Sequence, residues 1–190
     1  MPETKDLILE KAVPADWEDM YRNVWSRPAC CRYMFWDLTV NEADARDRMA
    51  RTIRWQETHD AWIIREKAGG RVIGFTGVAL GDPETAEEQG VCLCPEYWRK
   101  GYGTQVLQAL MAYAQTTLHA KRFVCRARKE NTASRKLIEK EGFSFLGEET
   151  VSDHRDGRPA VLVCYEKALS YGEGLREEEA GKGAACEIRF

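Results

Sequence analysis

Residues 94–104 read Cys-Pro-Glu-Tyr-Trp-Arg-Lys-Gly-Tyr-Gly-Thr, and this stretch decides the expected fold. It ends a strand predicted over residues 87–94 and begins a helix predicted over residues 102–118, where apolar side chains recur at helical spacing. A helix N-terminus presents unpaired N–H groups and the positive end of the helix dipole. Because the two glycines let an anion approach the backbone and the Arg-Lys pair adds positive charge, the stretch is suited to bind a diphosphate.

The Gly-x-Gly pattern before a helix is not specific to one ligand. It also occurs in dinucleotide-binding and nucleoside-triphosphate-binding loops. This stretch lacks the third glycine of the Rossmann pattern and the Gly-Lys-Ser/Thr of a P-loop, and its strand lies in the middle of the chain. A nucleotide-binding loop and a plain strand-to-helix turn therefore remain as alternatives on this evidence.

The rest of the chain predicts a mixed order of strands and helices. Predicted strands cover residues 7–13, 61–67, 71–80, 87–94, 123–127, 143–151 and 160–167, with a turn at 81–83. Predicted helices cover residues 14–25, 42–58, 102–118 and 132–141. Asn41 is the expected cap of the second helix, and Gly142 is suited to end the last one. Strands that alternate with helices after a run of hairpins favour a mixed α/β sheet.

Length, charge and cysteine spacing exclude several classes of protein. The 190 residues predict one compact domain over 1–169 and a loosely ordered, Gly- and Glu-rich tail over 170–190. A net charge of −3 argues against direct nucleic-acid binding, and no apolar run approaches the roughly 18 residues of a membrane span. The seven cysteines form no Cys-x-x-Cys pair, so we expect reduced thiols and no metal. Because the start also lacks a secretory signal, we expect a cytoplasmic location.

A second segment, from Cys125 to Phe143, joins a buried strand to a helix that opens Asn131-Thr-Ala-Ser134 and closes Gly142-Phe143. Together with the loop at residues 95–104, it resembles the GNAT N-acetyltransferase superfamily. The nearest resemblance is to the branch of ribosomal-protein-alanine and spermidine-type acetyltransferases. That branch has Pro-Glu-Tyr-Trp-x-Lys-Gly-Tyr-x-Thr in the loop, and its later helix opens Asn-x-x-Ser and closes Gly-Phe. The resemblance covers about residues 7–168.

The resemblance implies the acyl-CoA N-acyltransferase fold of this superfamily, a single α/β (α+β) domain. Its mixed, mostly antiparallel, seven-stranded sheet is flanked by about four helices, and its fourth and fifth strands splay apart. Acetyl-CoA is the implied co-substrate, and its pantetheine arm would pair with the open strand edge in that wedge. The implied activity is transfer of acetyl to an amine, either a small molecule or a protein N-terminus. An acyl-CoA sensor without turnover is the alternative, and a homodimer is left open.

The expected contacts with acetyl-CoA fall in three places. The strand edge contributes Val91, Cys92 and Leu93. The diphosphate loop contributes Arg99, Lys100, Gly101, Tyr102, Gly103 and Thr104. The later helix contributes Asn131, Ser134 and Lys136, the last for the ribose phosphate, with Arg135 as a rival. Seven basic residues against one acid between positions 121 and 136 agree with an anionic ligand, although a solvated face would look the same.

Acetyl transfer to an amine needs a donor for the developing oxyanion and a proton for the leaving thiolate. A backbone N–H near Leu93 is the expected oxyanion donor. Many family members use a tyrosine as general acid seven residues after the asparagine, but that position is Ile138 here. The resemblance then assigns the proton donor to Ser134, whose alternative role is to bond local backbone at the helix start.

The general base stays open among three residues. Glu88 belongs to the predicted strand and would share one face with Gly90 and Cys92 by simple alternation. Asp153 and the neighbouring His154 lie in the turn after the sixth strand. A base can act through a water chain, so nearness in sequence does not choose among them.

The acceptor pocket is expected in the aromatic connection over residues 28–40. Four side chains there are candidates to contact the amine: Tyr33, Phe35, Trp36 and Asp37. Packing in the core is their alternative role. An acidic rim formed by Asp37, Glu42 and Glu88 would favour a cationic amine.

Overall fold

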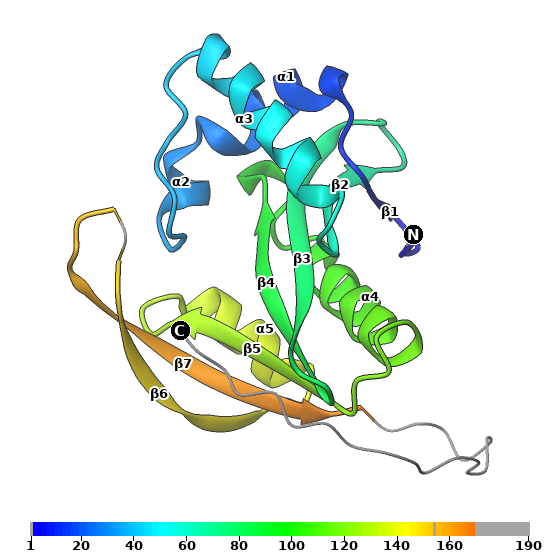
Figure 1. The fold of residues 1–190 in the computed structure, drawn as a ribbon, viewed down its shortest axis with the longest axis vertical. Coiled ribbons are helices and arrows are strands. Elements are labelled where there is room, and N and C mark those ends of the chain that lie inside the picture. The colour runs from blue at the N-terminus through cyan, green and yellow to red at the C-terminus, as the bar shows by residue number, and fades with distance from the viewer. Residues whose placement is uncertain (1, 154, 170–190) are drawn as a thin grey trace.

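Seven strands form one sheet in the order β1-β2-β3-β4-β5-β7-β6 in the computed structural model, which describes residues 2–153 and 155–169 (Figure 1). Every neighbouring pair is antiparallel except β4 with β5, which is parallel. The mixed, mostly antiparallel, seven-stranded sheet is therefore confirmed. The tail predicted over 170–190 and the candidate base His154 lie outside the described residues.

The strands are β1 (Leu7–Glu10), β2 (Ala61–Glu66), β3 (Val72–Asp82), β4 (Thr85–Leu93), β5 (Arg122–Arg128), β6 (Ser144–Ser152) and β7 (Pro159–Ala168). The α-helices are α1 (Trp17–Met20), α2 (Pro28–Cys31), α3 (Glu42–Gln56), α4 (Tyr102–Thr116) and α5 (Thr132–Lys140). The prediction of about four helices counted neither α2 nor the break between α1 and the π-helical turn Tyr21–Trp25. The turn predicted at 81–83 lies instead at Pro83 and Glu84, because β3 continues through Asp82.

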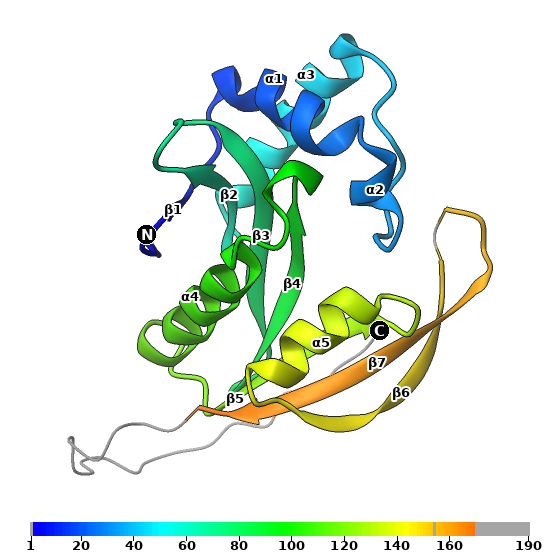
Figure 2. The same ribbon diagram turned by 180° about the vertical axis from the view of Figure 1, so that it is seen from behind.

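Helices cover both faces of the sheet, with α4 and α5 on one face and α1 and α3 on the other (Figures 1 and 2). Each face has its own apolar cluster. Under α4 and α5, Leu110 and Ile138 pack with Phe123 of β5. On the opposite face, Met49 of α3 packs with Ile63 of β2. Burial on both sides explains the nearly continuous apolar runs at residues 61–64 of β2 and 72–80 of β3.

Strands β4 and β5 pair over only three residues and then separate. The register is Thr85 with Arg122, Ala86 with Phe123 and Glu87 with Val124. Beyond this point β4 continues along β3 and β5 continues along β7, so the sheet opens into two arms (Figure 1). We call the gap between these arms the wedge. The splay predicted between the fourth and fifth strands is thus confirmed.

A β-bulge in β4 lies just beyond the point where the wedge begins. Thr76 pairs with Val91 and Val78 pairs with Glu88, so two residues of β4 stand opposite Gly77 alone. Gly90 accommodates this with a φ of +105°, which disfavours other residues. Phe75 pairs with Cys92, and Phe75 and Val78 are three residues apart on β3, hence on opposite faces. The prediction that Glu88 shares a face with Cys92 is therefore wrong.

The base of the wedge depends on Phe123, and its replacement should destabilise the fold. Phe123 is fully buried and packs edge-on against Phe143 at 6.1 Å between ring centroids. We expect Phe123→Ala to lower the free energy of unfolding by about 3–5 kcal/mol in urea denaturation. Phe145→Ala is the matched control, because Phe145 is 64% exposed, and its loss should stay below about 1 kcal/mol. Equal losses for the two variants would contradict this account of the core.

Candidate active site

The edge of β4 that faces the wedge carries main-chain groups of Leu93. The Cys94 N–H donates to the Ile73 carbonyl of β3 at 2.7 Å. Because main-chain groups alternate sides along a strand, the N–H and C=O of Leu93 then point away from β3, toward the wedge. The Leu93 carbonyl accepts a hydrogen bond from the Trp98 indole N–H at 2.7 Å. Along the described part of β5, no residue pairs with β4 beyond Glu87, so the Leu93 N–H lies on an open edge.

The same alternation separates the three predicted edge residues. The main-chain groups of Val91, two residues before Leu93, also point toward the wedge, and its side chain packs against the cluster under α4 and α5. Cys92 has the opposite orientation: its carbonyl points at Gly74 of β3, and its side chain lies in the cluster on the α3 face. The structure therefore brings Val91 and Leu93 to the wedge and turns Cys92 away from it.

The loop before α4 has the backbone form of an anion site. Arg99 and Gly101 have φ values of +61° and +79°, so two left-handed residues stand one apart directly before the helix. Turns of this kind gather successive N–H groups into a concavity that attracts anions. Two side-chain contacts hold the loop in place. The Tyr102 hydroxyl donates to Glu66 Oε1 at 2.9 Å, and the Lys100 ammonium lies 4.6 Å from the centroid of the Tyr97 ring.

Gly103 has a second role that the sequence did not reveal. A Cβ atom at this position would lie 3.0 Å from Leu137 Cδ2 of α5. The glycine therefore allows the first turn of α4 to approach α5 closely, in addition to leaving the backbone open to a ligand.

The N-terminus of α5 lies on the same face of the sheet as α4 (Figure 2). The Asn131 side chain caps this helix by accepting from the Ser134 N–H at 3.2 Å. Arg135 is engaged elsewhere, because it donates to the Tyr165 hydroxyl at 3.0 Å and to the Lys129 carbonyl at 3.2 Å. Lys136 is exposed and forms no ion pair with the described residues. It is therefore the freer of the two candidates for a phosphate.

Glu88 is the carboxyl group with the most unusual surroundings in the wedge. It lies opposite Val78, on the face covered by α4 and α5. Its Oε1 atom is buried and has no hydrogen-bond partner among the described residues. Burial raises the pKa of Glu88 to about 7, although the Gly90 N–H and the charge of Arg126 oppose this shift. A carboxyl with this pKa can accept a proton near neutral pH.

Asp153, the rival base, has the opposite surroundings. The residue is 3% exposed, and its carboxylate accepts hydrogen bonds from both Arg128 and Arg155. These bonds, those of Arg155 first, hold the pKa of Asp153 well below its usual range. A carboxylate held in this way is a weak base, so the geometry gives no support to the prediction of Asp153 as general base.

The four residues predicted to contact the acceptor divide into two pairs. The Tyr33 carbonyl and the Phe35 ring contact Arg128 at the end of β5. Trp36 and Asp37 instead line a surface cavity of about 660 Å³ against α3. The acidic rim is also wrong, because Asp37 lies at this cavity whereas Glu88 lies on the other face of the sheet.

Two residues near the wedge escaped the sequence analysis. Trp98 bonds the Leu93 carbonyl, and only its place inside the loop motif could have pointed to it. Arg128 pairs with an acid 25 residues away, and such a contact leaves no local signal. Among residues 2–153 and 155–169, no group of three or more His, Cys, Asp or Glu side chains could hold a metal ion. None of the helices in this part of the chain has the length and apolarity to cross a membrane.

Comparison with known proteins agrees with this geometry. The family model described as an acetyltransferase (GNAT) domain matches residues 6–144. An uncharacterized N-acetyltransferase, p20, from Bacillus licheniformis is 28% identical over 181 residues, which cover 94% of this chain and 97% of that protein.

Solved structures show the same fold. The GNAT-family acetyltransferase from Bacillus anthracis has a TM-score of 0.74 at 19% identity, over 88% of this chain and 97% of that one. The spermidine N-acetyltransferase from Vibrio cholerae, in complex with CoA and spermine, has a TM-score of 0.69 at 16% identity, over 86% and 96% of the two chains. With a family model that spans most of its length, a split sheet and an anion-binding loop before α4, this chain belongs to the GNAT acetyltransferase family.

Proposed function

We propose that this protein transfers acetyl from acetyl-CoA to an amine by direct attack of the amine on the thioester. One observation carries the proposal: Glu88, whose Oε1 atom is buried and has no hydrogen-bond partner among the described residues, lies where β4 and β5 separate. A sensor that binds acyl-CoA without turnover would have no need of such a group. We therefore favour the enzyme over the sensor, and assign the activity to a domain over residues 1–169.

The residues around the wedge fit a coenzyme that has a diphosphate and an amide-containing arm. The loop N–H groups over residues 99–104 would hold the diphosphate, with Arg99 and Lys100 adding charge. The open edge at Val91 and Leu93 would pair with the amides of the arm. Asn131 would contact the arm with the groups that its cap bond leaves free, and Lys136 would meet the ribose phosphate.

Three groups of this chain would then share the chemistry. The Leu93 N–H would donate to the thioester oxygen as it gains charge, a contribution of about 3 kcal/mol at comparable sites. Glu88 would accept the proton of the attacking ammonium, directly or through water. Ser134, half-buried at the start of α5, would donate a proton to the leaving thiolate.

The acceptor is proposed to be a small amine or a protein N-terminus. The Pro95–Thr104 and Asn131–Ser134 motifs support the branch of ribosomal-protein-alanine and spermidine-type enzymes. The spermidine N-acetyltransferase fold is consistent with this choice. Cytoplasmic location and the absence of a nucleic-acid partner remain predictions from composition.

A screen of amines and peptide N-termini tests the proposal. Purified protein with acetyl-CoA should release free thiol in the presence of at least one acceptor, and mass spectrometry should find that acceptor heavier by one acetyl group. Stabilisation by acetyl-CoA without thiol release across a broad panel would favour the sensor. Stabilisation by NAD or ATP, but not by CoA, would contradict the coenzyme assignment.

Charge at the first turn of α4 should control coenzyme binding. We expect Gly103→Asp to weaken CoA binding by at least about tenfold more than Gly103→Asn, measured by calorimetry. Both side chains meet Leu137 in the same way, so the comparison isolates the negative charge from the packing of α4 on α5. Equal dissociation constants for the two variants would remove the diphosphate from this loop.

Glu88 should control the pH dependence of turnover. Its pKa of about 7 means that the ionised, proton-accepting form increases as the pH rises from 6 to 8, so kcat should rise over this range. We expect Glu88→Gln to lower kcat by about 100-fold and to abolish this rise, with CoA affinity unchanged. Glu87→Gln is the control, because Glu87 pairs with Arg126 on the opposite face. An unchanged pH profile in Glu88→Gln would exclude Glu88 as the base.

A further inference from the structure

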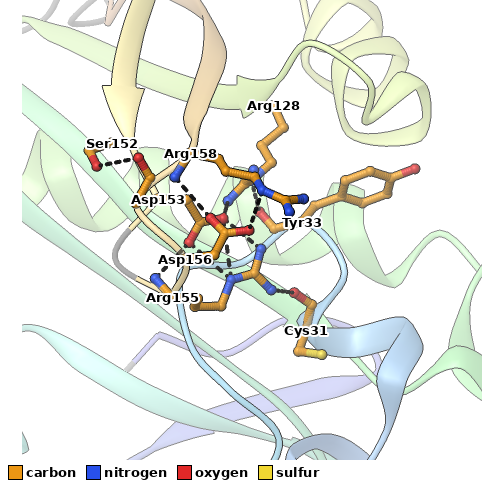
Figure 3. Close-up of polar contacts among 9 residues, drawn as sticks. Cys31, Tyr33, Arg128, Ser152, Asp153, Arg155, Asp156 and Arg158 are labelled. Atoms are coloured by element: carbon orange, nitrogen blue, oxygen red, sulfur yellow. Dashed lines mark hydrogen bonds and ion pairs between the residues drawn. The ribbon is translucent and has the colours of Figure 1, made fainter.

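The two arms of the sheet are connected a second time, at the open side of the wedge. The connection consists of Arg128 at the end of β5, Asp153 and Arg155 in the turn between β6 and β7, and the carbonyls of Cys31 and Tyr33 (Figure 3). We call these five groups the arginine–aspartate junction. They come from three parts of the chain that lie far apart in sequence.

Asp153 is the centre of the junction. Its carboxylate accepts from Arg128 Nη2 and from Arg155 at 3.0 Å (Nε) and 2.7 Å (Nη2). The backbone N–H of Arg155 adds a further bond at 3.0 Å. The turn itself is closed by the Asp153 N–H to the Arg158 carbonyl at 2.8 Å. One carboxylate therefore orients two guanidinium groups at once.

Each arginine uses its remaining donors on the segment after α2. Arg128 Nε donates to the Tyr33 carbonyl at 3.1 Å, and its guanidinium lies 4.4 Å from the centroid of the Phe35 ring. Arg155 Nη1 donates to the Cys31 carbonyl at 3.2 Å. A planar guanidinium held on one side by a carboxylate has its other donors aimed in a fixed direction. Arg128 and Arg155 thus link the Asp153 carboxylate to the carbonyls of Tyr33 and Cys31.

The segment after α2 is also attached to the end of β4. Cys30 Sγ approaches the Leu93 carbonyl at 3.8 Å, and Cys92 Sγ approaches the Cys30 carbonyl at 3.8 Å. Met34 reaches the bulge, since its Cε atom lies 3.4 Å from where a Cβ of Gly90 would be. Residues 30–35 therefore connect the far end of β4, at the Leu93 carbonyl, to the far end of β5. We call residues 31–35 of this segment the wall.

We propose that Asp153 is a positioning residue for the acceptor: through Arg128 and Arg155 it holds the wall at residues 31–35 at a fixed distance from the wedge. The proposal rests on the proposed function, because it assigns this wall to the acceptor side of the same site. Coenzyme binding is assigned to the loop before α4 and the start of α5. The junction meets the start of α5 through the main chain only, where the Asn131 N–H donates to the Arg128 carbonyl at 2.8 Å, and a change at the Asp153 side chain leaves this bond in place. Loss of the Asp153 charge should therefore weaken acceptor binding selectively.

The test compares Asp153→Asn with Asp156→Asn. Asp156 lies in the same turn and its side chain faces Arg158, so its replacement is a matched control. With the acceptor found in the screen, Asp153→Asn should raise the acceptor KM by about tenfold or more. The kcat, its pH profile and CoA affinity should stay close to those of the unchanged protein, and Asp156→Asn should alter none of these quantities. Asp153→Glu, which restores the charge, should recover part of the loss.

Hydrogen exchange gives a readout that does not depend on turnover. Backbone amides of residues 31–37 should exchange faster in Asp153→Asn, whereas those of residues 99–104 should not change. If Asp153→Asn does not fold, Arg155→Gln removes the bond to Cys31 while keeping the Arg128–Asp153 pair, and the same changes are expected at smaller size.

The outcomes distinguish this proposal from the proposed function on which it rests. A wild-type protein that transfers no acetyl refutes the proposed function, while faster exchange at residues 31–37 would still support the junction. An active wild type with unchanged acceptor KM and unchanged exchange in Asp153→Asn overturns the positioning role. Loss of the pH-dependent rise in kcat in Asp153→Asn also overturns it, because Asp153 would then be the base.

Discussion

The structure depends on the parting of β4 from β5 after only three paired residues. A bulge bends the strand that contains it and increases its twist, and the bulge opposite Gly77 begins just where the pairing ends. From there β4 follows β3 and leaves the Leu93 N–H on an open edge. The same bulge brings Val91 and Leu93 onto the face of Glu88, which α4 and α5 cover, so one irregularity places the binding edge and the candidate base together.

Two carboxyl groups near the wedge show how the surroundings of a side chain decide its chemical role. Glu88 has a buried oxygen without a partner in the described chain, and its pKa rises to about 7. Asp153 is more fully buried but accepts bonds from two arginines, which hold its pKa well below the usual range. Burial disfavours the charged form of a carboxyl group that has no partner, whereas ion pairing stabilises the charged form. One group is therefore suited to move a proton, and the other is suited to hold its neighbours in place.

A split sheet needs support at its open side, because the arms share few strand bonds. In this chain α4 and α5 pack together on one face, where Gly103 lets α4 approach Leu137. The arginine–aspartate junction connects the ends of the arms through residues 31–35. The wedge is thus bounded by helix packing on the coenzyme side and by charged hydrogen bonds on the other. Only the second kind of contact ends on carbonyls of a loop.

Local patterns in the sequence were enough to predict the order of the main elements, the Asn41 cap, the glycine turn before α4 and the family, since each depends on residues a few positions apart. Three features depended on tertiary structure. The face of Glu88 follows from a bulge in strand pairing, the role of Asp153 follows from arginines on other elements, and Tyr33 and Trp36 part because the loop runs between two arms. The pKa of a side chain, and the face of the sheet on which it lies, depend on residues that are its neighbours in space. One sequence pattern is compatible with many sets of such neighbours.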